Sequence, residues 1–341
     1  MEDLKPGCPC RSPGISAYCD GKENTPMKLV YLDNAATTPC CPQALAAVNK
    51  ALDGPCGNPS SHYSIGYEAK ELVDTGRAQV AKALNADPSE IFFTGCGSEA
   101  DNWAIKGTAF KLAAQGKKHL ITSAFEHHAI MHSMAMLERI GFEVSYIKPD
   151  SDGYIHPEDV EAAIRPDTAL ISIMMANNEI GTIQPIKELA AVAHAHKIWF
   201  HTDAVQAVGA IPVDVKELGV DMLSLSGHKF NAPKGIGALY IRKGISPWNF
   251  LDGGGQESRR RAGTENVAGI AAIGAALEAA TQNLPARMEH EQKLRDYVID
   301  RVLKNIPQAR LNGGRDKRLP GNANISFPGL EGETILLDLD M

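Results

Sequence analysis

The middle of the chain alternates between short apolar stretches and longer stretches with helical periodicity, and this alternation limits the fold more than any other feature. Short apolar stretches typical of strands are predicted at 91–94, 119–122, 143–147, 169–174, 198–202, 221–225 and 237–241. Helices are predicted between most of them, notably at 128–140, 157–164 and 186–196. Buried strands that alternate with helices indicate an α/β fold with a mainly parallel central sheet.

The regions before and after this alternation also carry predicted structure. Helical periodicity marks 42–53, 66–84, 266–282 and 286–304, a final helix is predicted from Thr334 to Asp340, and short strands are predicted at 28–32 and 322–327. Residues 1–27 are predicted to form a flexible tail. At 341 residues, the chain is long enough for one large domain and a smaller one.

Composition excludes several classes of partner. Hydrophobic residues make up 44% and charged residues 22%, which is ordinary for a soluble globular protein. The net charge of −7 gives no reason to expect nucleic acid or an anionic membrane as a partner. The chain has no apolar run suited to a bilayer, and its N-terminus has Glu2 and Asp3 instead of an apolar signal core. We therefore expect a cytoplasmic protein.

The cysteines are confined to the first part of the chain. They lie at positions 8, 10, 19, 40, 41, 56 and 96. An odd number in a chain without a signal sequence favours free thiols over a disulfide framework. Cys8, Cys10 and Cys19 lie in the tail, where three thiols without a clear fourth ligand are weak evidence for a metal site, and their role stays open.

One lysine and one aspartate suggest the chemistry. Lys229 follows Ser226, Gly227 and His228, and Asp203 follows the predicted strand at 198–202. This pattern suggests a pyridoxal 5′-phosphate site, in which the lysine forms a Schiff base and the aspartate pairs with the pyridinium nitrogen. The alternatives are a solvated surface lysine, and an aspartate that caps a helix or pairs with another cation.

Two nearby segments suit other parts of such a cofactor. The turn Gly95-Cys96-Gly97-Ser98 leads from a strand into a helix, where free N–H groups and the helix dipole favour a phosphate. A simple turn is the alternative interpretation. Gln206 lies three residues after Asp203, so its side chain is expected to reach the phenolic oxygen of the cofactor.

Two further loops carry polar side chains. His127 follows the strand at 119–122, and its imidazole is expected to stack on the pyridine ring and take part in proton transfer. The alternatives are a surface pair with His128, which the local sequence alone favours, or a metal site, although adjacent histidines point in different directions. Asn178 follows the strand at 169–174, where polar side chains contact ligands in open α/β sheets, and an Asx turn is an equal alternative.

A basic run precedes the helix at 266–282. It comprises Arg259, Arg260 and Arg261 and is followed by Ala262, Gly263 and Thr264. One interpretation is a phosphate contact that this loop lends to the site of a neighbouring subunit. A solvated charge run is the alternative, and we favour it for Arg259 and Arg260.

Taken together, the motifs resemble those of the cysteine desulfurases, the class V branch of the fold-type I pyridoxal-phosphate enzymes. The resemblance covers the chain from about residue 28 to the end. The matching stretches are Tyr31–Pro39, Gly57–Ser61, Thr94–Glu99, Glu126–His127, Asn177–Gly181, His201–Gln206, Ser226–Lys229 and Arg261–Thr264.

The resemblance implies a fold-type I transferase architecture, with helices on both faces of the central sheet. It places a large cofactor-binding domain at 39–284 and a small α+β domain, lacking its C-terminal part, at 28–38 and 285–341. Lys229 would hold the cofactor and move protons. The other implied cofactor contacts are Gly97, Ser98, Ser226 and His228 for the phosphate, His127 and Asp203 for the ring, Gln206 for the phenolic oxygen, and Thr264 from a partner subunit. Asn178 would help to place the substrate.

The implied activity is the conversion of L-cysteine to L-alanine. The sulfur would pass to an enzyme persulfide and then to iron–sulfur cluster or thiolation acceptors, including a scaffold protein. The implied assembly is a homodimer.

The C-terminal region departs from the family pattern. In the family, a loop with the catalytic cysteine follows the segment that corresponds to Gly332–Leu337, and here the sequence stops at Met341. Cys96 is expected on the wrong face to replace that thiol, and no motif marks Cys40, Cys41 or Cys56 as a nucleophile. Three interpretations follow: a truncated desulfurase, which we favour; a lyase acting on selenocysteine or another substrate without a protein thiol; or a non-catalytic homologue.

Overall fold

The structure is a computed structural model that describes residues 30–54 and 57–340. It contains two compact units, residues 1–32 and 33–341. In the first unit the described residues 30–32 form neither helix nor strand, so the strand predicted at 28–32 is wrong over these positions. An apolar run becomes a strand only when its backbone groups find a neighbour to pair with. The predicted tail at 1–27 lies outside the described residues.

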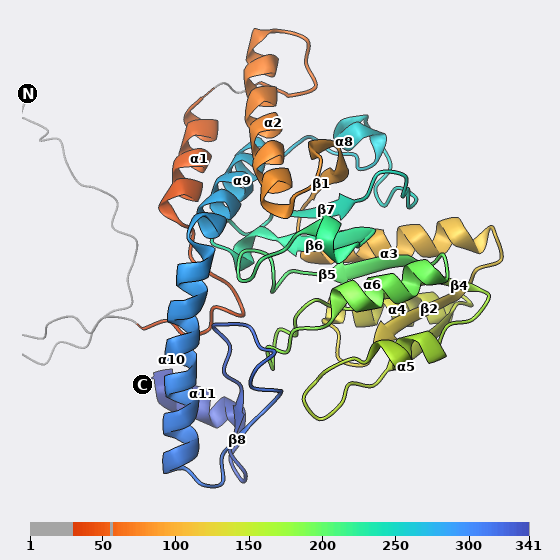
Figure 1. Cartoon of the computed structure of the whole chain (residues 1–341). Helices are drawn as coiled ribbons and strands as arrows, with labels where there is room; N and C mark the ends of the chain where they lie inside the picture. Colours follow the sequence, from red (N-terminus) through yellow and green to blue (C-terminus); the bar gives the residue numbers. More distant parts are fainter. Residues whose placement is uncertain (1–29, 55–56, 341) are drawn as a thin grey trace, which may run out of the picture. The chain divides into compact units, whose positions relative to one another are not determined.

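A seven-stranded sheet forms the centre of the second unit (Figure 1). Its strands are β1 (Ile91–Thr94), β2 (His119–Ser123), β3 (Glu143–Ile147), β4 (Thr168–Ser172), β5 (Trp199–Asp203), β6 (Met222–Ser226) and β7 (Gly237–Ile241). Their order is β1-β7-β6-β5-β4-β2-β3, and β7 alone runs antiparallel to its neighbours. The prediction of a mainly parallel sheet is confirmed, and the predicted strand boundaries differ by at most two residues.

Helices cover both faces of this sheet. They are α1 (Pro42–Asp53), α2 (Ser64–Leu84), α3 (Gly97–Ala113), α4 (His128–Arg139), α5 (Pro157–Ala162), α6 (Ile186–Ala195), α7 (Val215–Leu218), α8 (Gln256–Arg259) and α9 (Val267–Gln282). On one face, α3 lies across β4, β5, β6 and β7 and packs against α4. On the other face, α6 packs against β5, and α9 packs against α1 and α2.

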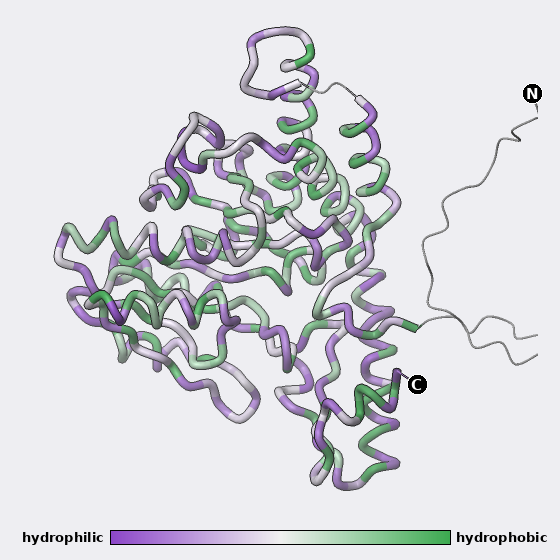
Figure 2. The backbone as a smooth tube through the Cα atoms, turned by 180° about the vertical axis from the view of Figure 1, so that it is seen from behind, coloured by the Kyte–Doolittle hydropathy of each residue, from purple (hydrophilic) through white to green (hydrophobic). Residues whose placement is uncertain are grey.

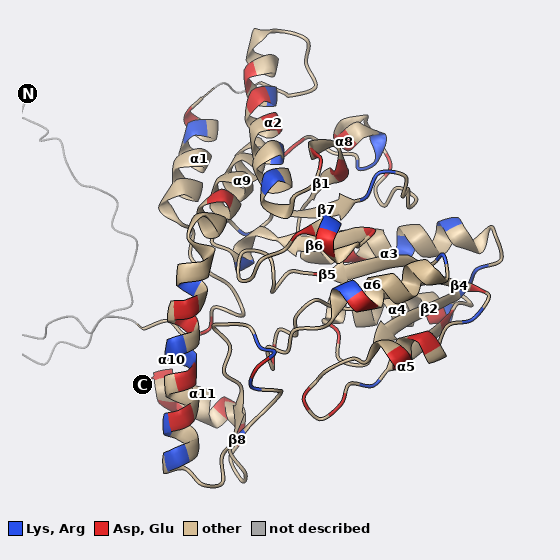
Figure 3. Ribbon diagram, viewed as in Figure 1, with Lys and Arg blue, Asp and Glu red and all other residues tan. Residues whose placement is uncertain are grey.

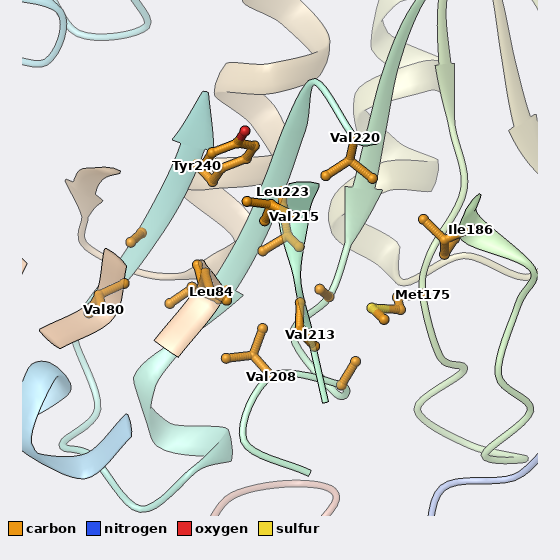
Figure 4. Packing of buried hydrophobic residues seen from close by; sticks show 14 of the residues in the cluster. Val80, Leu84, Met175, Ile186, Val208, Val213, Val215, Val220, Leu223 and Tyr240 are labelled. Atoms are coloured by element: carbon orange, nitrogen blue, oxygen red, sulfur yellow. The ribbon is translucent and has the colours of Figure 1, made fainter. Parts of the chain in front are cut away.

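The alternation of side chains along the strands divides the core into two layers. Leu120 and Leu239 belong to the cluster beneath α3 and α4, whereas their neighbours Ile121 and Tyr240 belong to the cluster on the opposite face. Figure 4 shows part of this second cluster, in which Leu84 of α2 lies near Tyr240 and Leu223 of the sheet. Burial on both faces explains why the inner strands are mainly apolar, whereas the edge strand β3 is only partly buried. In Figure 2, the hydrophobic colour accordingly gathers in the centre of this unit.

Two glycines allow α2 and α9 to approach each other closely. A Cβ added to Gly76 would lie 2.4 Å from the carbonyl oxygen of Ile270, and one added to Gly274 would lie 2.7 Å from the Cα of Gly76. Side chains at these positions would push the helices apart. This contact matters for the site because α9 also packs against the turn that carries Lys229.

The last part of the chain forms separate, smaller elements. They are α10 (Leu284–Asn305), β8 (Arg310–Leu311), β9 (Ile325–Ser326) and α11 (Gly332–Asp340). β8 and β9 pair in an antiparallel sheet, so the strand predicted at 322–327 exists but is shorter. Charged residues of both signs line α10 (Figure 3), and no described helix is long and apolar enough to span a membrane.

Candidate active site

The carboxyl ends of β1, β2, β4, β5 and β6 meet at one edge of the sheet. A cavity of about 460 Å³ lies at this edge, where ligands bind in open α/β sheets. Nine of the predicted site residues line it: Gly97, Ser98, His127, Asn178, Asp203, Gln206, Ser226, His228 and Lys229. Thr264, the remaining one, lines a different cavity.

The sheet register determines how Lys229 and Asp203 are placed. Asp203, the last residue of β5, pairs with Ser224 of the neighbouring parallel strand β6. After β6 ends at Ser226, a 3₁₀ turn over Gly227–Lys229 carries the lysine back over the strand ends. Both residues therefore reach the cavity from adjacent strands.

The amine of Lys229 is partly withdrawn from water. Its Nζ donates hydrogen bonds to the carbonyl oxygens of Ala35 and Ala36, the second at 2.9 Å. Burial lowers the pKa of Lys229, although the charges of Asp203 and Asp33 act in the opposite direction. A lowered pKa increases the neutral fraction of the amine, the form that can act as nucleophile and base.

Asp203 is 4% exposed and held in one orientation. Its Oδ1 accepts a hydrogen bond from the backbone N–H of Val205 at 2.9 Å. Burial raises the pKa of Asp203 to about 6, while this hydrogen bond and the charge of Lys229 lower it. The carboxyl is therefore mostly ionised at neutral pH, and it can pair with a cationic group in the cavity.

The opposite end of the cavity is formed by the start of α3. Cys96 is the N-cap residue and its side chain makes no capping hydrogen bond, so α3 begins without a side-chain acceptor from that residue. A Cβ added to Gly97 would lie 2.8 Å from Val205 Cγ2 and 3.2 Å from Ser226 Cβ. This close approach leaves the first turn of a 17-residue helix facing the cavity, an arrangement suited to an anion.

An ion pair ties this turn to the loop with the basic run. Arg261 donates from Nε to Glu99 Oε1 at 2.7 Å, and Glu99 Oε2 accepts from the N–H of Gly95 at 2.7 Å. Arg261 is thus a structural partner of the α3 turn within the same chain. Arg260, expected to be solvated, instead places its guanidinium 5.1 Å from the centre of the Phe92 ring.

His127 lies at the mouth of the cavity as the N-cap of α4. Its Nδ1 accepts a hydrogen bond from the N–H of Ala129 at 3.1 Å, which leaves Nε2 to carry the proton in the neutral ring. Partial burial lowers the pKa of His127, and the charge of Lys229 lowers it further. His128 instead stacks on His132, with ring centres 5.2 Å apart. No cluster suited to a metal ion occurs among residues 30–54 and 57–340.

The sequence left open whether this loop contacts a ligand or forms an Asx turn, and the two adjacent asparagines do one each. Asn177 is buried and makes the Asx turn, because its Oδ1 accepts from the N–H groups of Glu179 and Ile180, both at 2.9 Å. Asn178 is half-buried and lines the cavity. A residue from the C-terminal region also holds this loop, because Asn322 Nδ2 donates to the carbonyl oxygen of Glu179 at 2.9 Å.

Gln206 and His228 are both held by the segment before α1. Gln206 Nε2 donates to the carbonyl oxygen of Ala35 at 3.0 Å, and His228 Nδ1 lies 3.1 Å from Thr37 Oγ1. This segment therefore closes one side of the cavity. The match at Tyr31–Pro39 contained the signal for it, although no role was assigned to its residues.

Thr264 lies on an exposed loop. It lines a cavity of about 240 Å³ together with Gly95 and Arg261, apart from Lys229. Within this chain, Thr264 does not line the cavity that holds the predicted phosphate end.

Sequence reasoning missed Asp101, which lines the main cavity and is 1% exposed. In the sequence it stands among polar residues of a helix and resembles a solvated position. Cys96 also lines the cavity, at its α3 end. Cys40, Cys41 and Cys96 are free thiols, whereas Cys8, Cys10, Cys19 and Cys56 lie outside the described residues.

Comparisons with known proteins agree with this geometry. Residues 30–341 match the model of the family described as aminotransferase class-V. The chain is 51% identical to a cysteine desulfurase IscS of Methanosarcina thermophila, over 94% of this chain and 80% of the relative. It is 52% identical to a cysteine desulfurase IscS of Dictyoglomus turgidum, over 92% of this chain and 79% of the relative.

Solved structures show the same relationship. A NifS-like protein superposes with a TM-score of 0.88 at 39% identity, covering 91% of this chain and 85% of the other. A structure described as SspA in complex with cysteine superposes with a TM-score of 0.79 at 38% identity, covering 91% and 86%. The chain belongs to the class-V aminotransferase family and, within it, to the cysteine desulfurases, a membership that implies a pyridoxal-phosphate cofactor.

Proposed function

We propose that this protein binds pyridoxal 5′-phosphate through Lys229 and converts L-cysteine to L-alanine, passing the sulfur to an acceptor thiol. The observation that carries the proposal is the convergence of Lys229, Asp203 and the first turn of α3 on one cavity. The related SspA structure in complex with cysteine supports cysteine as the substrate.

The side chains that line the cavity fit this cofactor. Its volume of about 460 Å³ is within the range of about 300–1,000 Å³ typical of small-molecule sites. A side chain at Gly97 would crowd Val205 and Ser226. The glycine therefore lets a phosphate come close to the backbone at the start of α3. The buried Asp203 matches a ring that carries a proton on its nitrogen.

Each cavity residue then has a task. The bound cofactor supplies an electron sink for the substrate. Lys229, whose neutral amine is favoured by burial, takes and returns the proton at the substrate Cα. His127 covers the ring from the mouth of the cavity, and Asn178 donates its amide to the substrate carboxylate.

The transfer of sulfur from cysteine requires one acceptor thiol and no other reactant. The Cβ–S bond of cysteine breaks, the sulfur joins the acceptor thiol as a persulfide, and Cβ gains a proton to give alanine. We assign no described cysteine to this role. Cys96 lies at the α3 end of the cavity, where the phosphate would bind, and Cys40 does not line the cavity. The thiol of Cys41 accepts the N–H of Ala44 at 3.4 Å. Acceptors in iron–sulfur cluster assembly or thiolation, at a cytoplasmic location, are part of the proposal.

The test has two stages. Adding pyridoxal phosphate to the apoprotein should produce the visible absorbance of a lysine-bound cofactor; Lys229→Ala should abolish it, and Lys118→Ala, at an exposed position, should keep it. Alanine should then form when cysteine and dithiothreitol are added. Absence of the absorbance change would refute cofactor binding, and its presence without alanine would refute the desulfurase activity.

We further propose that Thr264 contacts the phosphate in the site of a second subunit. Its exposed position beside Arg261 and Gly95 supports this assignment. Sedimentation should give a homodimer, and Thr264→Ala should weaken cofactor binding without changing Tm of the apoprotein. A monomer that binds the cofactor as tightly as the dimer would contradict the assignment.

The division into domains is proposed on the same basis. Residues 39–284 would form the cofactor-binding domain, and residues 285–341 most of the smaller one. Limited proteolysis should cut between these regions before it cuts within the first.

A further inference from the structure

Three carboxyl groups are buried beneath the proposed cofactor site. Asp203 at the end of β5, Asp101 in α3 and Glu126 in the loop after β2 are 4%, 1% and 7% exposed. Three buried negative charges so close together would be costly without cations to compensate them. Which of the three are ionised therefore decides the electrostatics of the site.

Asp101 has no cationic partner that would compensate a negative charge. Its Oδ1 is buried and makes no hydrogen bond, and the nearest ring nitrogen, Nε2 of His201, lies 3.7 Å away. Both nitrogens of His201 are engaged by hydroxyl groups, Nδ1 with Ser172 at 2.8 Å and Nε2 with Ser224 at 2.9 Å. Burial lowers the pKa of His201 to about 3, so this ring is neutral and offers Asp101 no charge.

Glu126 is in a similar position. Its Oε1 accepts hydrogen bonds from the hydroxyl of Ser123 and, at 2.9 Å, from the N–H of Met174. Its Oε2 is buried without a hydrogen-bond partner. Burial raises the pKa of Glu126 to about 8, and the charge of Asp203 contributes in the same direction.

The groups that face these carboxyls come from several elements. Burial raises the pKa of Asp101, and the charges of Asp203, Glu126 and Cys96 act in the same direction, whereas a hydrogen bond from Ser224 opposes them. Lys229 acts from the turn after β6 and lowers the pKa of Asp203, whose Oδ1 also has a backbone donor. Asp203 thus has a cation to support an ionised carboxyl, whereas Asp101 has only a hydroxyl group.

We propose that Asp101 and Glu126 each hold a proton at neutral pH and act as positioning residues that leave Asp203 as the single ionised carboxyl beneath the cofactor ring. This rests on the proposed function, in which Asp203 pairs with the ring nitrogen. A second ionised carboxyl would repel Asp203 and shift it towards its protonated form. With Asp101 and Glu126 neutral, the negative charge stays on Asp203, which would pair with the ring nitrogen.

The first test uses the apoprotein, so it does not depend on the cofactor. A carboxyl that is protonated in the folded state stabilises fully below its unfolded-state pKa, about 3.9 for Asp and 4.3 for Glu, and loses that contribution as pH rises towards the folded value. Asp101→Asn and Glu126→Gln keep the shape but cannot ionise. We expect the Tm of each variant, relative to wild type, to rise by at least about 2 °C between pH 5 and pH 8.

An unchanged or falling relative Tm for both variants over this pH range would show that the carboxyls are ionised in the folded protein, and would overturn the inference. If a variant fails to fold, the infrared band of protonated carboxyl groups still tests the wild-type protein directly. We expect this band at pH 7 and its loss at alkaline pH. Its absence at pH 7 would refute the inference.

The second test compares three amide variants in cofactor binding. Asp203→Asn should weaken the affinity for pyridoxal phosphate by about 30-fold, the value of a charge-assisted hydrogen bond. Asp101→Asn and Glu126→Gln should change it by less than about threefold, because a neutral amide replaces a neutral acid. Equal losses in all three would refute the inference, whereas a wild-type protein without cofactor binding would refute the proposed function instead.

Discussion

The floor and the rim of the cavity are built in different ways. The floor consists of buried groups on strand ends and on the first turns of α3, such as Asp203, Ser226 and Asp101. The rim consists of loop residues that are exposed or half-buried, such as His127 and Asn178. Strand register and helix packing fix the floor, whereas a few side-chain hydrogen bonds fix the rim. Changes in the packing of the floor should therefore affect folding and ligand binding together, and changes in the rim should mainly affect ligands.

The largest expected effect comes from lowering the pH, because it protonates the buried His201 of β5. His201 is buried and neutral, and burial lowers its pKa to about 3. A lowered folded-state pKa gives stability above the unfolded value of about 6.5, and this stability is lost as pH falls. We expect the wild-type apoprotein to lose about 2 kcal/mol from this group between pH 6.5 and 4.5, measured by urea unfolding.

His201→Gln should lower the free energy of unfolding at pH 7 by about 1–3 kcal/mol, because it disturbs the contacts with Ser172 and Ser224. It should also reduce the loss of stability between pH 6.5 and 4.5. His128→Gln, at an exposed position near the rim, should leave that loss unchanged. If the stability of both variants depends on pH as in the wild type, His201 is not the source of that dependence.

The next effect concerns the closest packing in the floor. Gly97→Val places a side chain against Val205 and Ser226, where even a Cβ would lie 2.8 Å from Val205 Cγ2. Overpacking should cost about 1–3 kcal/mol of stability, and the crowded turn should no longer hold pyridoxal phosphate. Thermal unfolding and absorbance titration measure the two effects. Gly332→Ala, which meets no atom within 4 Å, is the matched control and should change neither.

The adjacent asparagines test the boundary between the two regions. Asn177→Ala should destabilise the protein by about 1–3 kcal/mol, because the buried turn loses its acceptor and donor. Asn178→Ala should change stability by less than about 0.5 kcal/mol. It should, however, raise the cysteine concentration needed for the spectral change of the cofactor by about tenfold. The reverse pattern would show that Asn178, not Asn177, maintains the loop.

The smallest expected effect is at the rim itself. His127→Phe retains a ring but loses the N-cap hydrogen bond to Ala129, which should cost about 0.5–1 kcal/mol. His127→Asn retains a capping group but loses the ring, so it should leave Tm unchanged and weaken cofactor binding severalfold. Calorimetry and absorbance titration on both variants separate the two roles. Identical behaviour of the variants would mean that the cap and the ring cannot be distinguished at this position.

The strands of the floor were predictable because burial on both faces leaves a mainly apolar signal, as at 237–241. Lys229 and Asp203 were recognisable because they immediately follow such strands. The short pair β8 and β9 was harder, since a two-residue strand leaves little pattern. The predicted strand at 28–32 failed over its described residues for a related reason: an apolar run does not specify a pairing partner.

Asp101 and Thr264 show what remains outside the reach of local patterns. The burial of Asp101 depends on α3 lying across the sheet, a tertiary contact that neighbouring polar residues conceal. Thr264 lines a cavity apart from Lys229, so any role at the phosphate depends on a second subunit and stays a prediction.

The pairing of Asp203 with Ser224 has a practical consequence for protein engineering. Because the ladder between β5 and β6 fixes the spacing of Asp203 and Lys229, the length of the crossover between these strands does not set it. Lys216 and Glu217 are exposed on α7 within that crossover, so their side chains can be changed without disturbing the ladder. A fluorescent label attached to a side chain there would report on the folded protein while the lysine and the aspartate keep their separation.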